Sequence, residues 1–435
     1  MSLRLLLVGD MHLGKQPRLT PSLRALGVEG ATISPAAAWR RAAELAEEHA
    51  VHGVLCAGDL VNQKENCFEA LAELIGPLKA LHRAQIPVYA VAGNHDVEAL
   101  PMLAQWTDGA GFHLLGANGQ WQAVELHGDE GVKAELLGWS FPTQAYYESP
   151  LPGLPDRSDL KVPRIGLLHC DRDGHSSHAP VPSRELLDAP VDAWFLGHIH
   201  IPDREGLSQP QPLGYLGCLS PIRSKEFGWH GPWLATLDQA GTFTLEPLSC
   251  SPLRLEHVDC DLSGLSGTPQ RLESLLQART REALEAADEK LELKDDLRVV
   301  RVRLRLVGAV ADPLQIDQVI EAADYHNLSV PIGGRNWVVD RLTNECRRQV
   351  DLEELSRGHD PPAHLAQQQL RLEAGDDEDL IDAFRAFLRQ SELGTGRWSR
   401  WPEPSDEAIR ALLLRRGARH LAQLLGQKEE VPFEA

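Results

Sequence analysis

The chain has 435 residues, of which 43% are hydrophobic and 24% charged, and its formal net charge at pH 7 is −20. This composition excludes a wholly disordered chain, and no apolar run reaches the ~18–20 residues that a membrane span requires. So acidic a chain has no general attraction for nucleic acid, and binding to a polyanion needs local cations, whether metal ions, a basic strip or a basic partner.

The seven cysteines are scattered along the chain and form no Cys-x-x-Cys pair. This usage predicts reduced thiols in a cytoplasmic protein, and neither a zinc ribbon nor a disulfide framework. The apolar start at 3–8 runs into Gly9 and Asp10 without a small-residue cleavage site. We therefore interpret it as a buried strand and not as a signal peptide.

The first half of the chain alternates short apolar runs with stretches of helical periodicity. Strands are expected at 3–8, 54–57 and 88–92, with helices at 35–50 and 65–84 between them. This rhythm is typical of an α/β domain with a buried sheet. Later apolar runs have fewer helices between them and predict a second sheet. They lie at 135–139, 165–168, 194–196, 213–216, 233–237 and 242–245.

Composition and pattern predict three domains, at 1–250, 251–350 and 351–435. The second is expected to be a small α+β module and the third mainly helical, with helices at 379–390 and 405–425. The length is consistent with this number of domains.

A basic strand is expected at 298–306, within the second domain. Arg301, Arg303 and Arg305 recur with period 2 and therefore share one face of it. They could form a basic strip over a nucleic-acid duplex, or they could pair with the many nearby acids. The sequence leaves both alternatives open.

Polar clusters stand at the expected carboxyl ends of five strands. They are Asp10-x-His12, Gly58-Asp59, Gly93-Asn94-His95-Asp96, His169 and Gly197-His198-x-His200. Binding sites in open α/β sheets form outside the carboxyl ends of the strands, so neighbouring strands would bring the five clusters together. One such cluster alone is usually incidental, but five in succession, each after an apolar run, indicate a site.

The candidate metal ligands are two carboxylates, one amide oxygen and four imidazoles. They are Asp10, Asp59, Asn94, His12, His169, His198 and His200. This mixed set suits Mn²⁺, Fe²⁺ or Zn²⁺ and contains too much imidazole for Mg²⁺ or Ca²⁺. Since seven ligands exceed the needs of one ion, we expect two divalent ions that share a bridging carboxylate. Two ions about 3.5–4 Å apart can clamp a phosphate and activate a bridging hydroxide for in-line attack on phosphorus.

The order of these motifs resembles that of the calcineurin-like metallophosphoesterases. The resemblance covers 1–250 and implies a four-layer α-β-β-α sandwich, followed here by a small α+β capping domain and a helical C-terminal region. It also implies how the ligands divide between the ions. One ion would be held by Asp10, His12 and His200, the other by Asn94, His169 and His198, with Asp59 bridging.

The resemblance further implies two catalytic residues, His95 and Asp96. His95 would contact the scissile phosphate and assist the leaving group, and Asp96 would orient His95. Some relatives carry a second catalytic histidine where this chain has Asn62. That departure leaves His95 as the main candidate acid.

The stretch Gly9-Asp10-Met11-His12-Leu13-Gly14 is similar to the DNA-repair nuclease branch that contains SbcD and its Mre-eleven relatives. Stretches 166–200 and 215–231 are most similar to bacterial YhaO-like exonucleases. This likeness implies an Mn²⁺-dependent exonuclease or endonuclease that hydrolyses phosphodiester bonds at DNA ends in double-strand break repair. It implies an SMC-like, SbcC-like coiled-coil ATPase subunit as partner, bound by the C-terminal region, and no membrane; a homodimer is left open.

Two other classes of protein fit part of the pattern. A small-molecule phosphodiesterase or phosphatase would use the same dinuclear site, but it would need neither a cap nor a partner-binding tail. A non-catalytic scaffold would keep the fold alone, whereas this chain has every expected ligand and His95. Activity on a small phosphodiester without activity on DNA would favour the small-molecule enzyme. Failure to bind two metals would favour the non-catalytic scaffold.

Overall fold

The computed structural model describes residues 2–62, 67–107, 111–157, 161–395 and 404–430. The chain forms two compact units. The first comprises Met1–Val258, Leu284–Arg303 and Asn327–Arg341, and the second comprises Asp259–Ala283, Leu304–His326 and Leu342–Ala435. Among the described residues, no helix has both the length and the apolar character needed to cross a membrane.

The first unit contains a six-stranded sheet. Its strands, in spatial order, are β13 (Phe243–Pro247), β12 (Trp233–Asp238), β1 (Ser2–Val8), β2 (Gly53–Cys56), β3 (Val88–Ala90) and β4 (Phe112–Leu114). The strands from β1 to β4 pair in parallel, whereas β12 pairs with β1 and β13 in antiparallel fashion. The parallel ladder confirms the expected βαβ rhythm and aligns the carboxyl ends of β1, β2 and β3 at one edge.

A second sheet of five strands belongs to the same unit. Its strands, in spatial order, are β11 (Leu213–Tyr215), β10 (Ala193–Gly197), β7 (Arg164–His169), β6 (Lys133–Trp139) and β5 (Gln122–His127). β6, β7, β10 and β11 pair in parallel, and β5 is antiparallel to β6. The sequence did not indicate β5, because this edge strand is largely exposed and carries few apolar residues.

The sequence placed 233–237 and 242–245 in the second sheet, and this was wrong. They form β12 and β13, which return to pair with β1 at the edge of the first sheet. The local apolar pattern is the same in either sheet. Only the long-range pairing distinguishes the two positions, and residue periodicity does not encode it.

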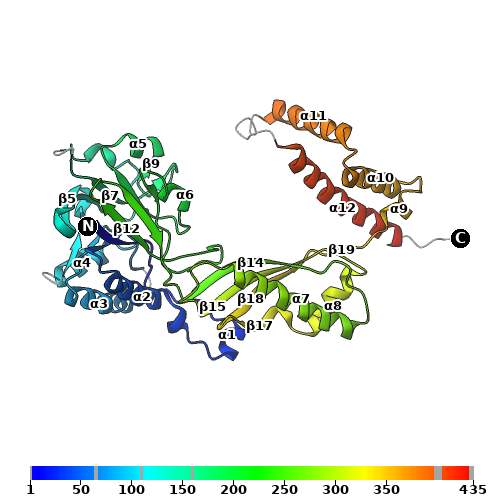
Figure 1. The fold of residues 1–435 in the computed structure, drawn as a ribbon, viewed down its shortest axis with the longest axis horizontal. Helices are drawn as coiled ribbons and strands as arrows, with labels where there is room; N and C mark the ends of the chain where they lie inside the picture. Colours follow the sequence, from blue (N-terminus) through cyan, green and yellow to red (C-terminus); the bar gives the residue numbers. More distant parts are fainter. Residues whose placement is uncertain (1, 63–66, 108–110, 158–160, 396–403, 431–435) are drawn as a thin grey trace. The chain divides into compact units, whose positions relative to one another are not determined.

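Alternation along β1 shows how the layers are built. Leu6 and Val8 point into the apolar core that contains residues of α2 (Pro35–Glu48) and α3 (Cys67–Arg83). Leu5 and Leu7 point the other way, into the core that contains β7 and β10. Figure 1 shows the helices on the two outer sides of the paired sheets. The fold is therefore the four-layer α-β-β-α sandwich that the resemblance implies.

The helices of the first unit lie close to their expected positions. α2 begins at Pro35, where the Ser34 hydroxyl accepts a hydrogen bond from the Ala37 N–H at 3.3 Å. It buries Trp39 against the first sheet. The shorter helices are α1 (Pro21–Ala25), α4 (Ala99–Trp106), α5 (Ser183–Asp188) and α6 (Arg204–Leu207).

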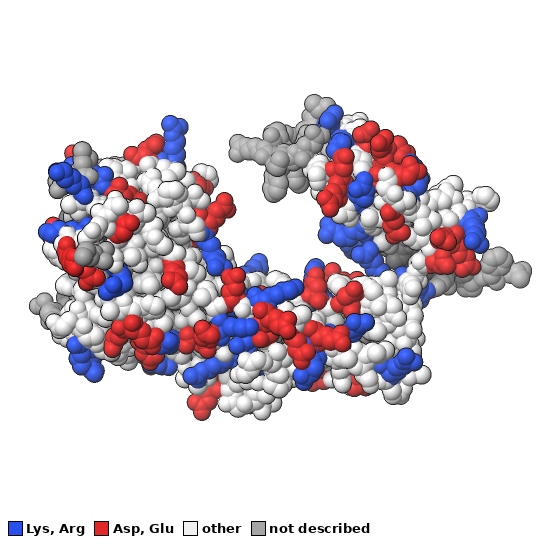
Figure 2. Space-filling view, viewed as in Figure 1, with Lys and Arg blue, Asp and Glu red and all other residues white. Residues whose placement is uncertain are grey.

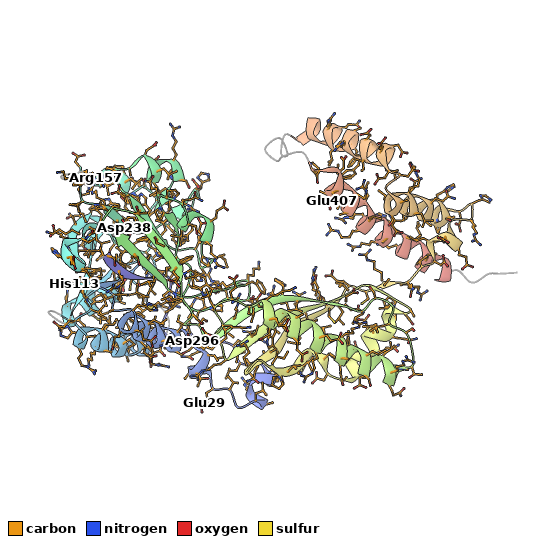
Figure 3. The ribbon with its side chains drawn as sticks, viewed as in Figure 1. Glu29, His113, Arg157, Asp238, Asp296 and Glu407 are labelled. Atoms are coloured by element: carbon orange, nitrogen blue, oxygen red, sulfur yellow. The ribbon has the colours of Figure 1, made fainter. Side chains whose placement is uncertain are left out.

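A four-stranded sheet follows in sequence. Its strands, in spatial order, are β14 (Leu253–Asp261), β15 (Val299–Val307), β18 (Arg335–Asn344) and β17 (Ser329–Ile332). The long helices of this region and of the C-terminal region are α7 (Pro269–Lys290), α8 (Pro313–Ala322), α10 (Pro361–Ala374), α11 (Glu378–Thr395) and α12 (Asp406–Glu430). In the first unit, Arg41 of α2 donates a hydrogen bond to Asp296 at 3.0 Å. Figure 3 labels Asp296.

The basic face of β15 does not form an unbroken strip. Arg301 pairs with Asp340, and Arg305 donates to both carboxylate oxygens of Asp259, at 2.7 and 2.5 Å. Figure 2 shows acidic and basic side chains interleaved over β14 and β15. Of the two alternatives left open by the sequence, pairing with acids therefore holds for Arg301 and Arg305.

Candidate metal centre

The loops after β1 and β2 are hydrogen-bonded to each other. The backbone N–H of Asp10 donates to the Gly58 carbonyl at 3.2 Å, and that of His12 donates to the Asp59 carbonyl at 2.9 Å. The two loops therefore hold their carboxylates side by side. Both carboxylates are buried, which confirms that adjacent strands bring the first two motifs together.

Four residues of the site have left-handed backbone conformations that side chains other than glycine rarely adopt. Their φ angles are 43° at Asp10, 46° at His12, 54° at Asp59 and 103° at His198. Such strain persists only where the surrounding structure enforces it, and it concentrates at functional sites. The backbone of these loops is thus shaped for the site and not for local stability.

Glycines precede four of the motifs because the loops approach their neighbours closely. A Cβ at Gly93 would lie 2.2 Å from Asp59 Oδ1, and one at Gly197 would lie 2.0 Å from the Ala57 carbonyl oxygen. Gly58 also has a φ of +89°. Glycine is therefore required for this convergence.

Gly93→Ala is expected to destabilise the fold by about 1–3 kcal/mol, because the added methyl overpacks a buried loop, and to lower the bound metal content. Thermal unfolding and elemental analysis would measure these effects. Gly53→Ala is the matched control, since a Cβ there meets neighbouring atoms only at 3.5 Å or more. Equal stability of the two variants would contradict the close packing assigned to Gly93.

One group of ligand atoms comes from Asp10, His12 and His200. Their candidate ligand atoms lie within 4.8 Å of one another, and all three residues are buried. The Nε2 atoms of His12 and His200 are 3.1 Å apart. The sequence-predicted members of the first ion position are thus together.

The second group is centred on His169, the last residue of β7. Its Nδ1 donates to the Ala57 carbonyl oxygen at 3.0 Å, which leaves a lone pair on Nε2. That Nε2 faces two further acceptors, Asn94 Oδ1 at 3.2 Å and Asp59 Oδ2 at 3.5 Å. These three atoms are all hydrogen-bond acceptors, and no donor hydrogen lies between them. Such a group of acceptors is suited to bind a cation.

Asp59 lies between the two groups. Its Oδ2 is 3.7 Å from His12 Nε2 and 3.5 Å from His169 Nε2, one member of each group. The His198 ring packs edge-on against His169 with centroids 5.3 Å apart, and its backbone N–H donates to the Asp10 carboxylate at 3.1 Å. The arrangement fits a carboxylate shared between two ions.

His95 and Asp96 occupy different surroundings. The backbone N–H of His95 donates to Asp59 Oδ1 at 2.9 Å, and its half-buried ring lies edge-on to His12 at 5.0 Å. The buried Asp96 carboxylate accepts from the backbone N–H groups of Gly93 at 2.7 Å and Leu60 at 2.6 Å. In the described structure it makes no hydrogen bond to the His95 ring, so any orienting effect on His95 passes through the loop backbone.

Burial controls the protonation of the site. It raises the pKa of Asp10 well above the ordinary value, and the negative charge of Asp59 adds to this rise. Burial alone would raise the pKa of Asp59, but the neighbouring His169, His12 and His95 rings lower it further than burial raises it, to about 2. Burial lowers the pKa of His198 to about 3. Neutral imidazoles with free lone pairs beside closely spaced carboxylates fit divalent cations.

Glu226 completes the surroundings of His200, and sequence reasoning gave it no role. Its Oε1 accepts from His200 Nδ1 at 2.6 Å, which leaves His200 Nε2 free to face the ion position. Its Oε2 accepts the backbone N–H groups of Ile222 at 2.6 Å and Arg223 at 2.8 Å. Metal-bound histidines often donate to such a carboxylate, and a buried glutamate downstream of the last histidine motif was the available signal.

Glu226→Gln is expected to weaken Mn²⁺ binding by about 10–100-fold. A glutamine amide can accept a hydrogen bond from His200 only if its NH₂ group faces the backbone N–H groups of Ile222 and Arg223. Donor would then face donor, and the side chain would no longer hold His200 in place. Titration calorimetry on metal-free protein would measure the change. The control is Glu135→Gln, which alters a similar pair with the buried Arg164 (Nε to Oε2, 2.5 Å) outside the centre. Unchanged affinity in the Glu226 variant would contradict its positioning role.

Two further residues lie beside the centre. Asn62 is buried, and its backbone N–H donates to the Leu13 carbonyl at 3.1 Å. The centroid of the His178 ring lies 4.8 Å from that of the His198 ring. His178 is thus in contact with an expected metal ligand.

Comparison with known proteins agrees with this geometry. Residues 3–202 match the family of calcineurin-like phosphoesterases. The match covers 200 of the 435 residues, a little under half of the chain. The matched segment ends after His200, so it contains all seven expected ligands and both expected catalytic residues.

Curated relatives are similar to parts of this chain, at 26–28% identity. The uncharacterized metallophosphoesterase YhaO of Bacillus subtilis is 28% identical over 194 residues, which cover 43% of this chain and 45% of YhaO. The DNA double-strand break repair protein Mre11 of Halobacterium salinarum is 27% identical over 293 residues, 64% of this chain and 67% of the relative. Mre11 of Aeropyrum pernix is 26% identical over 241 residues, which cover 52% of this chain and 56% of the relative. The matches thus span between about half and two thirds of these relatives.

Proposed function

We propose that this chain is a metal-dependent DNA exonuclease or endonuclease that hydrolyses phosphodiester bonds at DNA ends in double-strand break repair. The observation that carries the proposal is the convergence of acceptor atoms around Asp59, which suits two divalent ions in a phosphoesterase fold. The two Mre11 relatives support DNA as the substrate. We assign the ligand roles as the family resemblance implies, and we propose Mn²⁺, one of the ions that mixed nitrogen and oxygen donors suit, as the metal.

The bound ions and His95 would have different roles in hydrolysis. Two bound ions would supply a nucleophile from water and neutralise the charge that develops on the phosphate. A water oxygen then bonds to phosphorus as the bond from phosphorus to the leaving sugar oxygen breaks. His95 donates the proton to that oxygen. Burial lowers the pKa of His95, and an approaching phosphate opposes this change because a nearby negative charge favours the imidazolium ion.

The remainder of the chain suits a macromolecular substrate and a partner. We propose that 251–350 caps the DNA and that 351–435 binds an SMC-like coiled-coil ATPase subunit. In the second unit, α10 and α12 border an open cavity of about 650 Å³, whose apolar lining includes Leu365, Leu372, Leu413 and Leu424. An amphipathic helix would bury its apolar face in such a groove.

Hydrolysis of bis-p-nitrophenyl phosphate and of p-nitrophenyl phosphate tests the chemistry of the site. The proposal predicts metal-dependent cleavage of the diester that exceeds cleavage of the monoester, restored by Mn²⁺ after treatment with a chelator. Preference for the monoester would favour a phosphatase. Activity that survives complete metal removal would contradict a metal-dependent mechanism.

A further inference from the structure

An arginine-rich cavity of about 360 Å³ lies within the first unit. Its charged lining residues are five arginines and a single acid: Arg18, Arg223, Arg301, Arg303, Arg341 and Asp340. The chain as a whole carries a net charge of −20, so this concentration of positive charge runs against its composition. We call this feature the arginine cavity.

Two of the arginines are held in place by their surroundings. Arg301 pairs with Asp340, and Arg303 donates to the Ser224 carbonyl oxygen at 2.6 Å while its guanidinium lies over the Phe227 ring at 4.8 Å. The Nε atoms of both are buried without a hydrogen-bond partner. A buried donor without a partner is costly, and an anion in the cavity would provide an acceptor.

Arg18 and Arg341 are exposed, and within the described residues neither makes an ion pair. Since Asp340 can neutralise one guanidinium only, the cavity keeps an excess of positive charge. A guanidinium offers a planar fork of donors that matches the oxygens of a phosphate. The chemistry of the cavity therefore fits a phosphate group.

The wall of the arginine cavity is connected to the metal centre by one carboxylate. Ile222 and Arg223, which line the cavity, donate their backbone N–H groups to Glu226 Oε2, and Glu226 Oε1 accepts from His200. The wall of the cavity and the expected metal ligand His200 thus share one carboxylate as hydrogen-bond acceptor.

We propose that the arginine cavity binds a non-scissile phosphate of the polynucleotide strand whose cleavage takes place at the metal centre. This inference rests on the proposed nuclease function and specifies a polymer with several phosphates as the substrate. A contact to a phosphate carries no base-sequence information directly, so this contact would position the strand whatever its sequence.

The double variant Arg18→Ala/Arg341→Ala tests the proposal, because these two side chains make no ion pair that the substitution would break. Binding of a short DNA duplex is measured without metal by fluorescence anisotropy over a range of salt concentrations. Cleavage of the same duplex and of bis-p-nitrophenyl phosphate is measured with Mn²⁺. Arg184→Ala is the matched control, since Arg184 is 91% exposed and pairs only with Asp188 in the described structure.

The double variant should bind DNA about tenfold more weakly and show a smaller salt dependence, by about one unit of slope for each phosphate that the protein no longer neutralises. Its specificity constant should fall on DNA relative to that on the single-phosphate ester, and Arg184→Ala should match the wild type. Equal losses on both substrates, or no loss on DNA, would overturn the cavity assignment. Arginine-dependent binding of inorganic phosphate with unchanged DNA binding would assign the cavity to a free anion instead. A wild-type protein that hydrolyses the ester but neither binds nor cleaves DNA would overturn the nuclease function itself.

Discussion

Asp59→Ala is expected to lose both bound ions and to abolish phosphodiester hydrolysis. Asp59 is the one carboxylate in the described structure whose oxygen lies within 4 Å of a histidine from each ligand group, at 3.7 Å from His12 and 3.5 Å from His169. Its removal leaves buried imidazoles without the charge that offsets a second cation. Substitution of an outer partner of a metal ligand typically costs 10–100-fold in affinity or activity, and loss of a shared ligand should exceed about 100-fold.

Elemental analysis of the dialysed Asp59 variant, beside hydrolysis of bis-p-nitrophenyl phosphate, provides the measurement. Asp188→Ala is the control, because the Asp188 side chain is 71% exposed and pairs with Arg184 of the same short helix, α5. The wild type and the control should hold two ions. Retention of both ions by Asp59→Ala would show that this carboxylate does not bridge them.

His95→Ala is expected to keep both ions while losing cleavage of DNA by about 10²–10⁴-fold, the usual contribution of a general acid or base. The His95 side chain lies against the His12 ring, and only its backbone N–H bonds to Asp59. The loss should be smaller on bis-p-nitrophenyl phosphate, because nitrophenolate is a weaker base than a sugar alkoxide and needs less help from a proton.

The control for this variant is His113→Ala. His113 lies on β4, outside the centre (Figure 3), where it stacks on Tyr89 with ring centroids 5.1 Å apart. Metal content separates the two possible roles of His95. An equal loss on both substrates would show that leaving-group basicity is irrelevant, and a loss of metal would make His95 a ligand and not an acid.

The strand ends were the part of the site that the sequence predicted best. Short apolar runs that stop at Asp10, Asp59, Asn94, His169 or His198 are visible in the sequence. Parallel pairing aligns the ends of the first three runs in one sheet and those of the last two in the other. The glycines before these residues are visible too, although only the structure explains them by the close approach of neighbouring loops.

Other features depend on contacts that no local pattern encodes. Glu226 reaches His200 across 26 positions of intervening chain, and β12 returns to β1 across more than two hundred residues. Asp96 was expected to orient the His95 ring, but its oxygens are taken up by backbone N–H groups of two different loops. The position of β12 depends on long-range strand pairing, and that of Asp96 on the need of buried backbone N–H groups for a hydrogen-bond acceptor. Neither can be predicted from the identity of the side chains alone.

Cleavage of end-labelled duplex DNA distinguishes a nuclease from an enzyme that acts on small phosphodiesters. The wild type, Arg184→Ala and His95→Ala are compared with Mn²⁺ and after chelation. A nuclease of the proposed kind should give products shortened from the DNA ends, dependent on Mn²⁺ and on His95, and unchanged in Arg184→Ala. Intact DNA under conditions in which the wild type binds two ions and hydrolyses bis-p-nitrophenyl phosphate would contradict the proposed nuclease function, and would assign the centre to a small phosphodiester.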